Sequence, residues 1–222
     1  MFLRLWLRSA IAYLALNNTK FNIVYKYYYL RHYFREIGYF KSFTMKEPVD
    51  VKGLPIPWYT YSAIDFLTQR IGHKKNNYKI FEYGAGNSTI WWSKRVKKVH
   101  SVEHEKNWIK KLNSNNDNLN IDFCELDYDG EYCRFIQRFK HPFDIIVIDG
   151  RDRVNCIFQS FKHLTNHGII ILDNSGREKY IKGINFLINK GFKHIEFNGI
   201  NPLVAMPSNT SIFYKNDNLL GL

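Results

Sequence analysis

From residue 78 onward, short apolar runs alternate with segments of helical spacing, and this alternation most restricts the possible fold. Five helical segments separate the first six runs, near residues 88–95, 105–114, 130–139, 153–165 and 177–189. The seven apolar runs are YKIFEYG, VHSVEH, NIDFCELD, FDIIVIDG, GIIILDN, GFKHIEF and TSIFYK. Continuous apolar strands joined through helices are typical of a parallel sheet that is covered on both faces. The last two runs lack a convincing helix between them, which predicts an antiparallel pair.

The predicted fold is therefore α/β: a seven-stranded, mostly parallel, doubly wound sheet with an antiparallel last strand and helices on both faces. A further helix is predicted over residues 58–72, where apolar residues recur at helical spacing and Gly72 supplies the stop. The length of 222 residues suits one such domain. A hydrophobic share of 45% excludes gross disorder.

The first 47 residues form a basic, aromatic-rich segment, predicted to be a helical extension of a domain over residues 48–222. Arg4 and Arg8 interrupt its apolar run, which excludes a transmembrane helix and disfavours a signal peptide. Two interpretations remain. Leu3, Trp6, Leu7 and Leu14 could belong to an interfacial helix on an anionic membrane. Alternatively, the helix packs on the domain or on the partner in a homodimer.

The stretch KIFEYGAGNSTIWW, residues 79–92, predicts a buried strand, a glycine turn and a helix. In a doubly wound sheet, ligands bind beyond the carboxyl ends of the strands, where the strand order reverses. Gly84 and Gly86 allow a close backbone approach, and Ser88 or Thr89 can cap the helix. A dinucleotide site usually has a third glycine, where this chain has Thr89. Glu82 would repel a pyrophosphate and attract an ammonium group.

Acidic residues also end the next two predicted strands. Glu103 follows Gly84 by nineteen residues, where a carboxylate can accept both hydroxyls of a ribose. Glu125 and Asp127 end the third strand beside the same crevice. A ligand with a ribose, a cationic amino-acid end and no phosphate fits these acids best. S-adenosylmethionine has this chemistry.

In their order, FEYGAGNST, SVEHE, FDIIVIDG and GIIILDN resemble the motifs of class I S-adenosylmethionine-dependent methyltransferases, over roughly residues 58–215. The resemblance implies that the first motif holds the methionine part of the cofactor and that Glu103 holds the ribose. It places Glu125 or Asp127 near the adenine. The predicted cofactor-binding residues are Glu82, Tyr83, Gly84, Ala85, Gly86, Asn87, Ser88, Glu103, His104, Glu125, Asp127 and Asp149.

Methyl transfer to a hydroxyl requires that its proton be removed or stabilised. Asp149, Asp152 and Asp173 follow the fourth and fifth strands and are the predicted catalytic residues. Asp149, Asp173 and Asn174 offer hard oxygen ligands for Mg²⁺ or Ca²⁺, similar to the metal site of cation-dependent catechol and caffeoyl-CoA O-methyltransferases. Two other interpretations stay open. An arginine, Arg151 or Arg153, could pair with Asp149 or Asp152 and remove the need for a metal. Asp173 and Asn174 could instead cap a helix and close a turn.

We expect a cytoplasmic methyltransferase, or one peripheral to a membrane, that methylates a hydroxyl of a small molecule or glycan. The net charge of +12 favours anionic partners. RNA methylation is disfavoured, because the basic cluster over residues 94–98 is predicted to face away from the acceptor side. An NAD-binding or nucleotide-sugar-binding Rossmann enzyme and a non-catalytic membrane-associated binding module remain alternatives. The three cysteines form no CxxC motif, which fits a reducing compartment.

Overall fold

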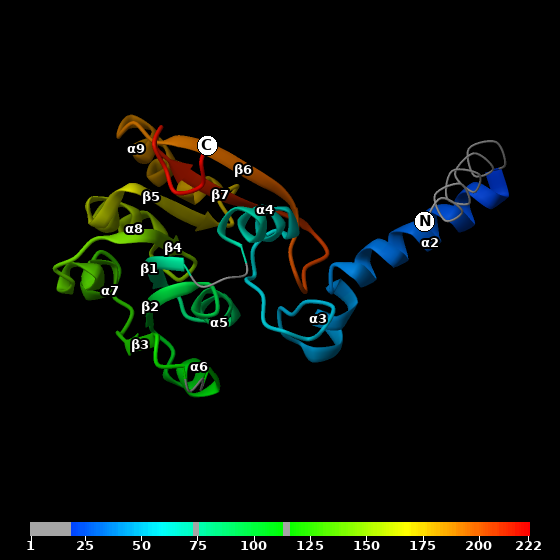
Figure 1. Ribbon diagram of the computed structural model, residues 1–222, viewed down its shortest axis with the longest axis horizontal. Coiled ribbons are helices and arrows are strands. Elements are labelled where there is room, and N and C mark those ends of the chain that lie inside the picture. The colour runs from blue at the N-terminus through cyan, green and yellow to red at the C-terminus, as the bar shows by residue number, and fades with distance from the viewer. Residues whose placement is uncertain (1–18, 73–75, 113–115) are drawn as a thin grey trace.

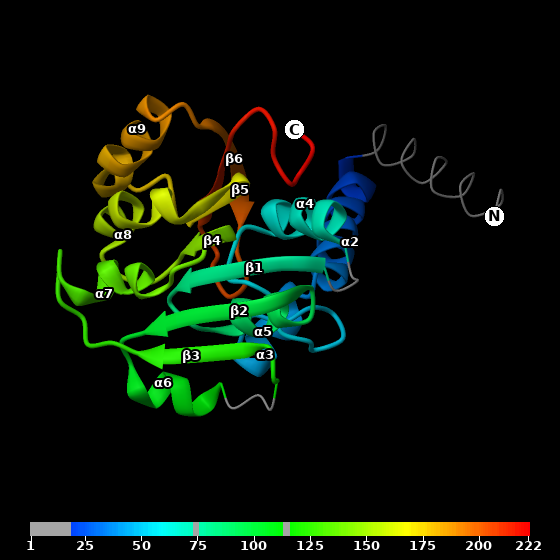
Figure 2. The same cartoon turned by 60° about the vertical axis from the view of Figure 1, so that its left-hand side comes forward.

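The structure, a computed structural model, describes residues 19–72, 76–112 and 116–222. Its described strands form one sheet in the order β3-β2-β1-β4-β5-β7-β6 (Figures 1 and 2). The strands are β1 Asn76–Tyr83, β2 Val96–Glu103, β3 Leu119–Phe123, β4 Phe143–Ile148, β5 Leu164–Asp173, β6 Lys193–Ile200 and β7 Pro207–Tyr214. Strands β1 to β5 are parallel, and β7 is antiparallel to both β5 and β6. The predicted topology is confirmed.

Helices cover both faces of this sheet (Figure 2). The helices of the sheet domain are α4 Tyr61–Ile71, α5 Asn87–Ser93, α6 Lys106–Lys111, α7 Glu131–Arg134, α8 Arg153–Ser160 and α9 Ile181–Asn189, with short 3₁₀ turns at Phe135–Arg138, Phe161–His163 and Glu178–Tyr180. The Thr60 hydroxyl caps α4 by accepting from the Ala63 N–H. The helices lie within the segments predicted from the sequence.

Alternation along the strands divides the core into two layers. Phe81 of β1 and Ile146 of β4 face the layer that contains α7, α8 and α9. Ile80 of β1 and Ile145 of β4 face the opposite layer, which contains α4 and α5. All four side chains are fully buried. Both faces of the central strands are therefore apolar, which explains why these strands read as continuous apolar runs.

The three cysteines are buried on the face covered by α7 and α8, and none forms a disulfide. Burial raises the pKa of the Cys133 thiol to about 12 and holds the pKa values of Cys124 and Cys156 above the ordinary thiol value. These thiols therefore act as small apolar core groups.

The N-terminal part of the described chain is an extension of two helices, α2 Thr19–Glu36 and α3 Tyr39–Met45. Helix α3 is tied to the following segment, because the Ser42 hydroxyl donates to the Val49 carbonyl at 2.9 Å. Helix α2 projects away from the sheet domain (Figure 1) and exposes large apolar side chains along its length. The apolar residues of the predicted interfacial helix, numbers 3 to 14, lie outside the described residues.

No helix in the described part of the chain is long and apolar enough to cross a membrane.

Candidate cofactor crevice and acid pair

Gly84 and Gly86, the two glycines after β1, have different roles in the structure. Gly84 has φ +91°, and a Cβ there would lie 2.7 Å from the Gly150 Cα. It therefore allows the turns after β1 and β4 to meet backbone to backbone. Gly86 has extended backbone, and a Cβ there would come no closer than 3.9 Å to Ser88 or Trp108. The described fold does not require a glycine at this position. Without a side chain, the backbone at Gly86 allows the close approach of a ligand.

Glu82 lies beneath the glycine turn and does not face the crevice as predicted. Its side chain is fully buried. Its carboxylate accepts hydrogen bonds from the hydroxyls of Ser88 at 2.6 Å, Thr89 at 2.5 Å and Ser101 at 2.8 Å. Burial raises the pKa of Glu82 to about 7, although these hydroxyls oppose the shift. Glu82 therefore joins the turn to α5 and β2, and the prediction that it attracts a ligand's ammonium group needs correction.

Glu103 ends β2 and reaches the same turn. Its Oε2 accepts from the Ala85 N–H at 3.0 Å, and its Oε1 accepts from the N–H groups of His104 and Glu105 at 2.7 and 2.9 Å. The Nδ1 atom of His104 lies 2.8 Å from the same Oε1. A carboxylate has about four acceptor directions. Three are used by backbone donors, which leaves one for a ribose hydroxyl.

Sequence reasoning missed Trp108, which follows Glu103 by five residues on α6. Its indole N–H donates to the Ala85 carbonyl at 2.6 Å. The same nitrogen lies on the side toward which a Gly86 Cβ would point. Trp108 thus forms an aromatic wall beside the turn, and a half-buried aromatic ring is suited to contact a planar base. The signal in the sequence was a tryptophan at the start of the helix after the ribose acid.

Other predicted cofactor residues have structural partners. The Asn87 amide donates to the Pro48 carbonyl at 2.8 Å and so ties the N-terminal segment to the turn. The Tyr83 hydroxyl is buried in the core and donates to the Cys133 carbonyl. Asp127 accepts from two N–H groups at the start of α7, which lowers its pKa. Glu125 is exposed and remains available beside the end of β3.

Asp149 and Asp173 come together beyond β4 and β5, as predicted, and an arginine lies with them. Arg153 is 8% exposed and donates to Asp149 Oδ1 at 2.9 Å, while its guanidinium lies 3.8 Å from Asp173 Oδ2. It also donates to the backbone carbonyls of Asp149, Gly150 and Asp173. Thr210 donates to Asp173 Oδ1 at 2.9 Å. One buried cation therefore serves two carboxylates.

The two carboxylates have raised pKa values. Burial, followed by the charge of Asp149, raises the pKa of Asp173 to about 8, and Arg153 and Thr210 act against this shift. Burial also raises the pKa of Asp149, against the opposing effect of Arg153. The Asp149 side chain is 19% exposed and that of Asp173 is 4% exposed. Asp149 is therefore the member of the pair that solvent or an acceptor reaches more readily.

Asp152, the third predicted catalytic residue, is occupied elsewhere. It precedes α8 in the left-handed conformation, with φ +48°. Its carboxylate accepts from the Asp129 N–H and from the Asn155 amide, both at 2.8 Å. Asp152 therefore joins the loop before α7 to the start of α8, and its predicted catalytic role needs correction.

The predicted Mg²⁺ or Ca²⁺ site does not fit the residues present. Arg153 supplies the positive charge between Asp149 and Asp173, and a metal ion there would have to displace it. The Asn174 amide donates to the Ser208 hydroxyl at 3.2 Å. Within residues 19–72, 76–112 and 116–222, no three His, Cys, Asp or Glu side chains form a group that could hold a metal. The alternative in which an arginine pairs with Asp149 agrees with the structure.

Several solved structures resemble this chain. An rRNA methylase from Streptococcus thermophilus has a TM-score of 0.51 and 16% identity, over 68% of this chain and 92% of its own. An O-methyltransferase from Bacillus cereus in complex with SAH has a TM-score of 0.52 and 20% identity, over 67% and 77%. Precorrin 8w decarboxylase from Methanobacterium thermoautotrophicum has a TM-score of 0.50 and 17% identity, over 72% and 92%.

No protein-family model matches the sequence, and no curated protein sequence matches it. At these identities, the likeness to the solved structures concerns the fold. The chain has the fold of class I S-adenosylmethionine-dependent methyltransferases.

Proposed function

We propose that this protein is an S-adenosylmethionine-dependent methyltransferase that methylates a hydroxyl of a small molecule or glycan without a metal ion. The observation that carries the proposal is Gly86. It leaves the turn after β1 without a side chain beside Trp108 and close to Glu103, at the point where the strand order reverses. The SAH complex of the Bacillus cereus O-methyltransferase supports the choice of cofactor.

The turn and its neighbours would bind the cofactor. The backbone at Gly84 to Gly86 would approach the methionine part, and the last acceptor direction of Glu103 would receive a ribose hydroxyl. Exposed Glu125 and the ring of Trp108 would flank the adenine. When bound, the cofactor supplies a methyl group on a sulfonium, which a nucleophile attacks in line.

Asp149 and Asp173, the acid pair, would take up the proton that the acceptor hydroxyl loses. Asp149, the more exposed carboxylate, would accept this proton, and Asp173 would share it. A general base works best when its pKa lies near the working pH, and the pKa of Asp173, raised by burial to about 8, fits this requirement. Arg153 would keep at least one carboxylate ionised and hold both in place.

Calorimetric titration with S-adenosylmethionine and S-adenosylhomocysteine tests the proposal, with NAD as the comparison ligand. We expect both sulfur compounds to bind and NAD not to bind. Gly86→Val should weaken binding by about tenfold or more, because a ligand pressed against this turn loses more than 1.4 kcal/mol when its contact is blocked. The melting temperature shows whether the variant stays folded, because an added Cβ would already lie 3.9 Å from both Ser88 and Trp108.

The matched control is Gly199→Ala in β6, where an added Cβ would come no closer than 3.5 Å to Ser62. It should bind both sulfur compounds like the wild type. A folded wild-type protein that binds neither sulfur compound would overturn the proposal. Tighter binding of NAD than of S-adenosylmethionine would favour the dinucleotide-enzyme alternative.

A further inference from the structure

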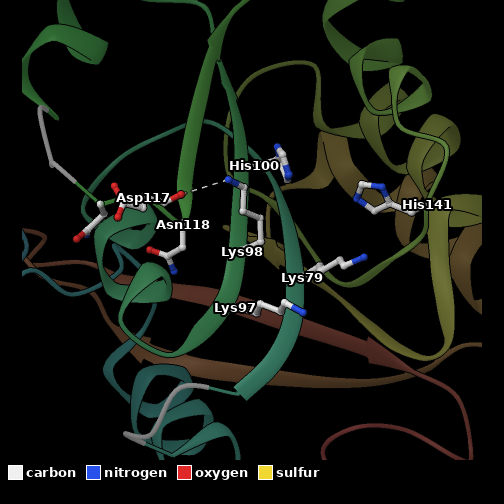
Figure 3. A pocket seen from close by; sticks show the side chains of 8 residues that line it. Lys79, Lys97, Lys98, His100, Asp117, Asn118 and His141 are labelled. Carbon is white, nitrogen blue, oxygen red and sulfur yellow. Dashed lines mark hydrogen bonds between the residues drawn. The ribbon is translucent and has the colours of Figure 1, made fainter.

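A basic hollow of about 510 Å³ lies at the amino-terminal ends of the central strands (Figure 3). Its lining includes Lys79, Lys97, Lys98, His100, His141 and Asp117. The proposed cofactor crevice lies at the opposite ends of the same strands. Lys98 and Glu103 both belong to β2, five residues apart, which corresponds to about 16 Å along an extended strand. The hollow is therefore separate from the crevice.

The lysines of this hollow form no ion pair in the described structure, although Asp117 also lines it. Lys79 of β1 and Lys98 of β2 are directly paired across the two parallel strands. Like charges directly opposite one another destabilise a sheet. The Lys98 ammonium donates to neutral oxygens, the Asp117 carbonyl at 3.4 Å and the Asn120 side chain at 3.2 Å. Lys79, Lys97 and Lys98 form no ion pair with any described carboxylate. A bound anion would relieve this repulsion.

His100 and His141 also line the hollow, and both rings pack against Phe139. The His100 ring lies 4.7 Å from Phe139 and 6.3 Å from His141, measured between ring centroids. The Nδ1 atom of His100 is buried and has no hydrogen-bond partner among the described residues. A buried imidazole nitrogen without a hydrogen-bond partner has a free-energy cost. In Figure 3 the Lys79 side chain extends toward His141.

We propose that this hollow binds a small soluble ligand through a phosphate or pyrophosphate group. The ammonium groups of Lys79 and Lys98 would donate charge-assisted hydrogen bonds to the phosphate oxygens. Asn118 also lines the hollow; its amide NH2 donates to the Ser93 and Val96 carbonyls, so only its side-chain oxygen would accept from the rest of the ligand. The hollow is as large as typical small-molecule sites, so it has room for more than the phosphate group itself. This inference does not depend on the proposed methyltransferase activity.

The test is calorimetric titration of the full chain with inorganic pyrophosphate at low ionic strength. We expect saturable binding at one site. The double variant Lys79→Gln/Lys98→Gln should weaken it by about tenfold or more, since each lysine would lose a charge-assisted hydrogen bond. The variant should keep its melting temperature, because the substitutions remove two like charges that face each other.

The matched control is Lys110→Gln/Lys193→Gln, which removes the same charge at two exposed lysines on α6 and β6. Its affinity for pyrophosphate should stay within about twofold of the wild type, because general attraction between distant exposed charges is screened by salt. Equal weakening in both double variants would overturn the site, since general attraction to a basic protein would then explain the binding. The absence of saturable binding would also overturn it.

Binding should tighten as the pH falls from 8 to 6. Burial, then the nearby charges of Lys98, His141 and Lys79, lower the pKa of His100, while Asp122 acts in the opposite direction. A bound anion favours protonated His100, so proton uptake should accompany binding. Because pyrophosphate also takes up a proton in this range, His100→Gln is the control. Equal pH dependence of binding in the wild type and His100→Gln would contradict the role of His100. Binding of single-stranded RNA that depends on Lys79 and Lys98, without binding of pyrophosphate, would replace the small ligand with a nucleic acid.

Discussion

The buried carboxyl group of Glu82 forms hydrogen bonds that join parts of the fold, but its ionisation in the folded state costs free energy. It is fully buried among three hydroxyl donors, and burial raises its pKa from 4.5 to about 7. The folded state therefore holds this proton more tightly than the unfolded state. The stabilisation from this group is complete below about pH 4.5 and is lost as the pH rises to about 7. The corresponding free energy is about 3 kcal/mol.

Glu82→Gln should abolish this pH dependence, because glutamine has no proton to lose in this range. We expect the free energy of unfolding of the wild type to fall by about 3 kcal/mol more than that of the variant between pH 5 and pH 8. Denaturant unfolding at several pH values measures this difference. Glu125→Gln, at an exposed carboxyl group, is the control and should follow the wild-type profile. Parallel profiles for wild type and Glu82→Gln would contradict the assignment.

Arg153 holds together two carboxylates that could not otherwise stay ionised side by side. Arg153→Met keeps much of the side-chain volume but leaves Asp149 and Asp173 buried without a positive charge. We expect the variant to lose about 3–5 kcal/mol of unfolding free energy at pH 8, the usual cost of removing one partner of a buried ion pair. The loss should shrink at pH 6, where the pair takes up protons in place of the arginine.

Urea unfolding of Arg153→Met and of Arg151→Met at both pH values measures this effect. Arg151 is exposed and lies two residues earlier, so its variant controls for the loss of charge. It should stay within about 0.5 kcal/mol of the wild type. Equal losses in the two variants would show that the buried guanidinium has no special role.

Among the elements, α2 exposes many large apolar side chains. Ile23 is 71% exposed, Val24 64% and Tyr27 67%. Lys26 and Arg31 lie among these side chains, on a helix whose described acidic residue is Glu36. The basic and apolar side chains of α2 are not divided into two faces, so the attraction of its positive charges to anionic headgroups would contribute most of any membrane binding. We therefore expect an anionic lipid surface to bind α2.

Flotation with vesicles of phosphatidylcholine, with and without phosphatidylglycerol, tests this expectation. The full chain should be recovered with the anionic vesicles, and less so at high salt, because the charge attraction is screened. Ile23→Ser/Tyr27→Ser should reduce recovery without lowering the melting temperature, because both side chains are exposed. If the wild type forms a dimer that this variant disrupts, and neither protein floats, then a second copy is the partner of α2.

At the scale of the whole molecule, the fold class could be predicted because strands buried on both faces have apolar runs in the sequence. Strand segments that are covered on both faces are mostly apolar, as are residues 145–148 of β4 and 169–172 of β5. The connections through helices then restrict the strands to a parallel sheet. The antiparallel pair at the end follows from the missing helix between β6 and β7.

The details of the site could not be predicted, because a motif does not reveal which way a side chain faces. Glu82 shares its face of β1 with Ile80, toward α5, so that Ser88 and Thr89 reach it from the helix. The sequence alone does not distinguish the buried Glu82 from an acid whose side chain faces a ligand. Likewise, two arginines follow Asp149, and α8 places Arg153 within the acid pair while Arg151 stays outside.

The burial of the three cysteines determines how their thiols can become chemically modified over time. All three thiols lie in one core layer, and burial keeps their pKa values high, so little thiolate exists at the surface. Oxidation, alkylation or metal capture at sulfur would therefore require the layer beneath α7 and α8 to open first. The fraction of modified cysteines in a sample would therefore measure how often this core layer has opened.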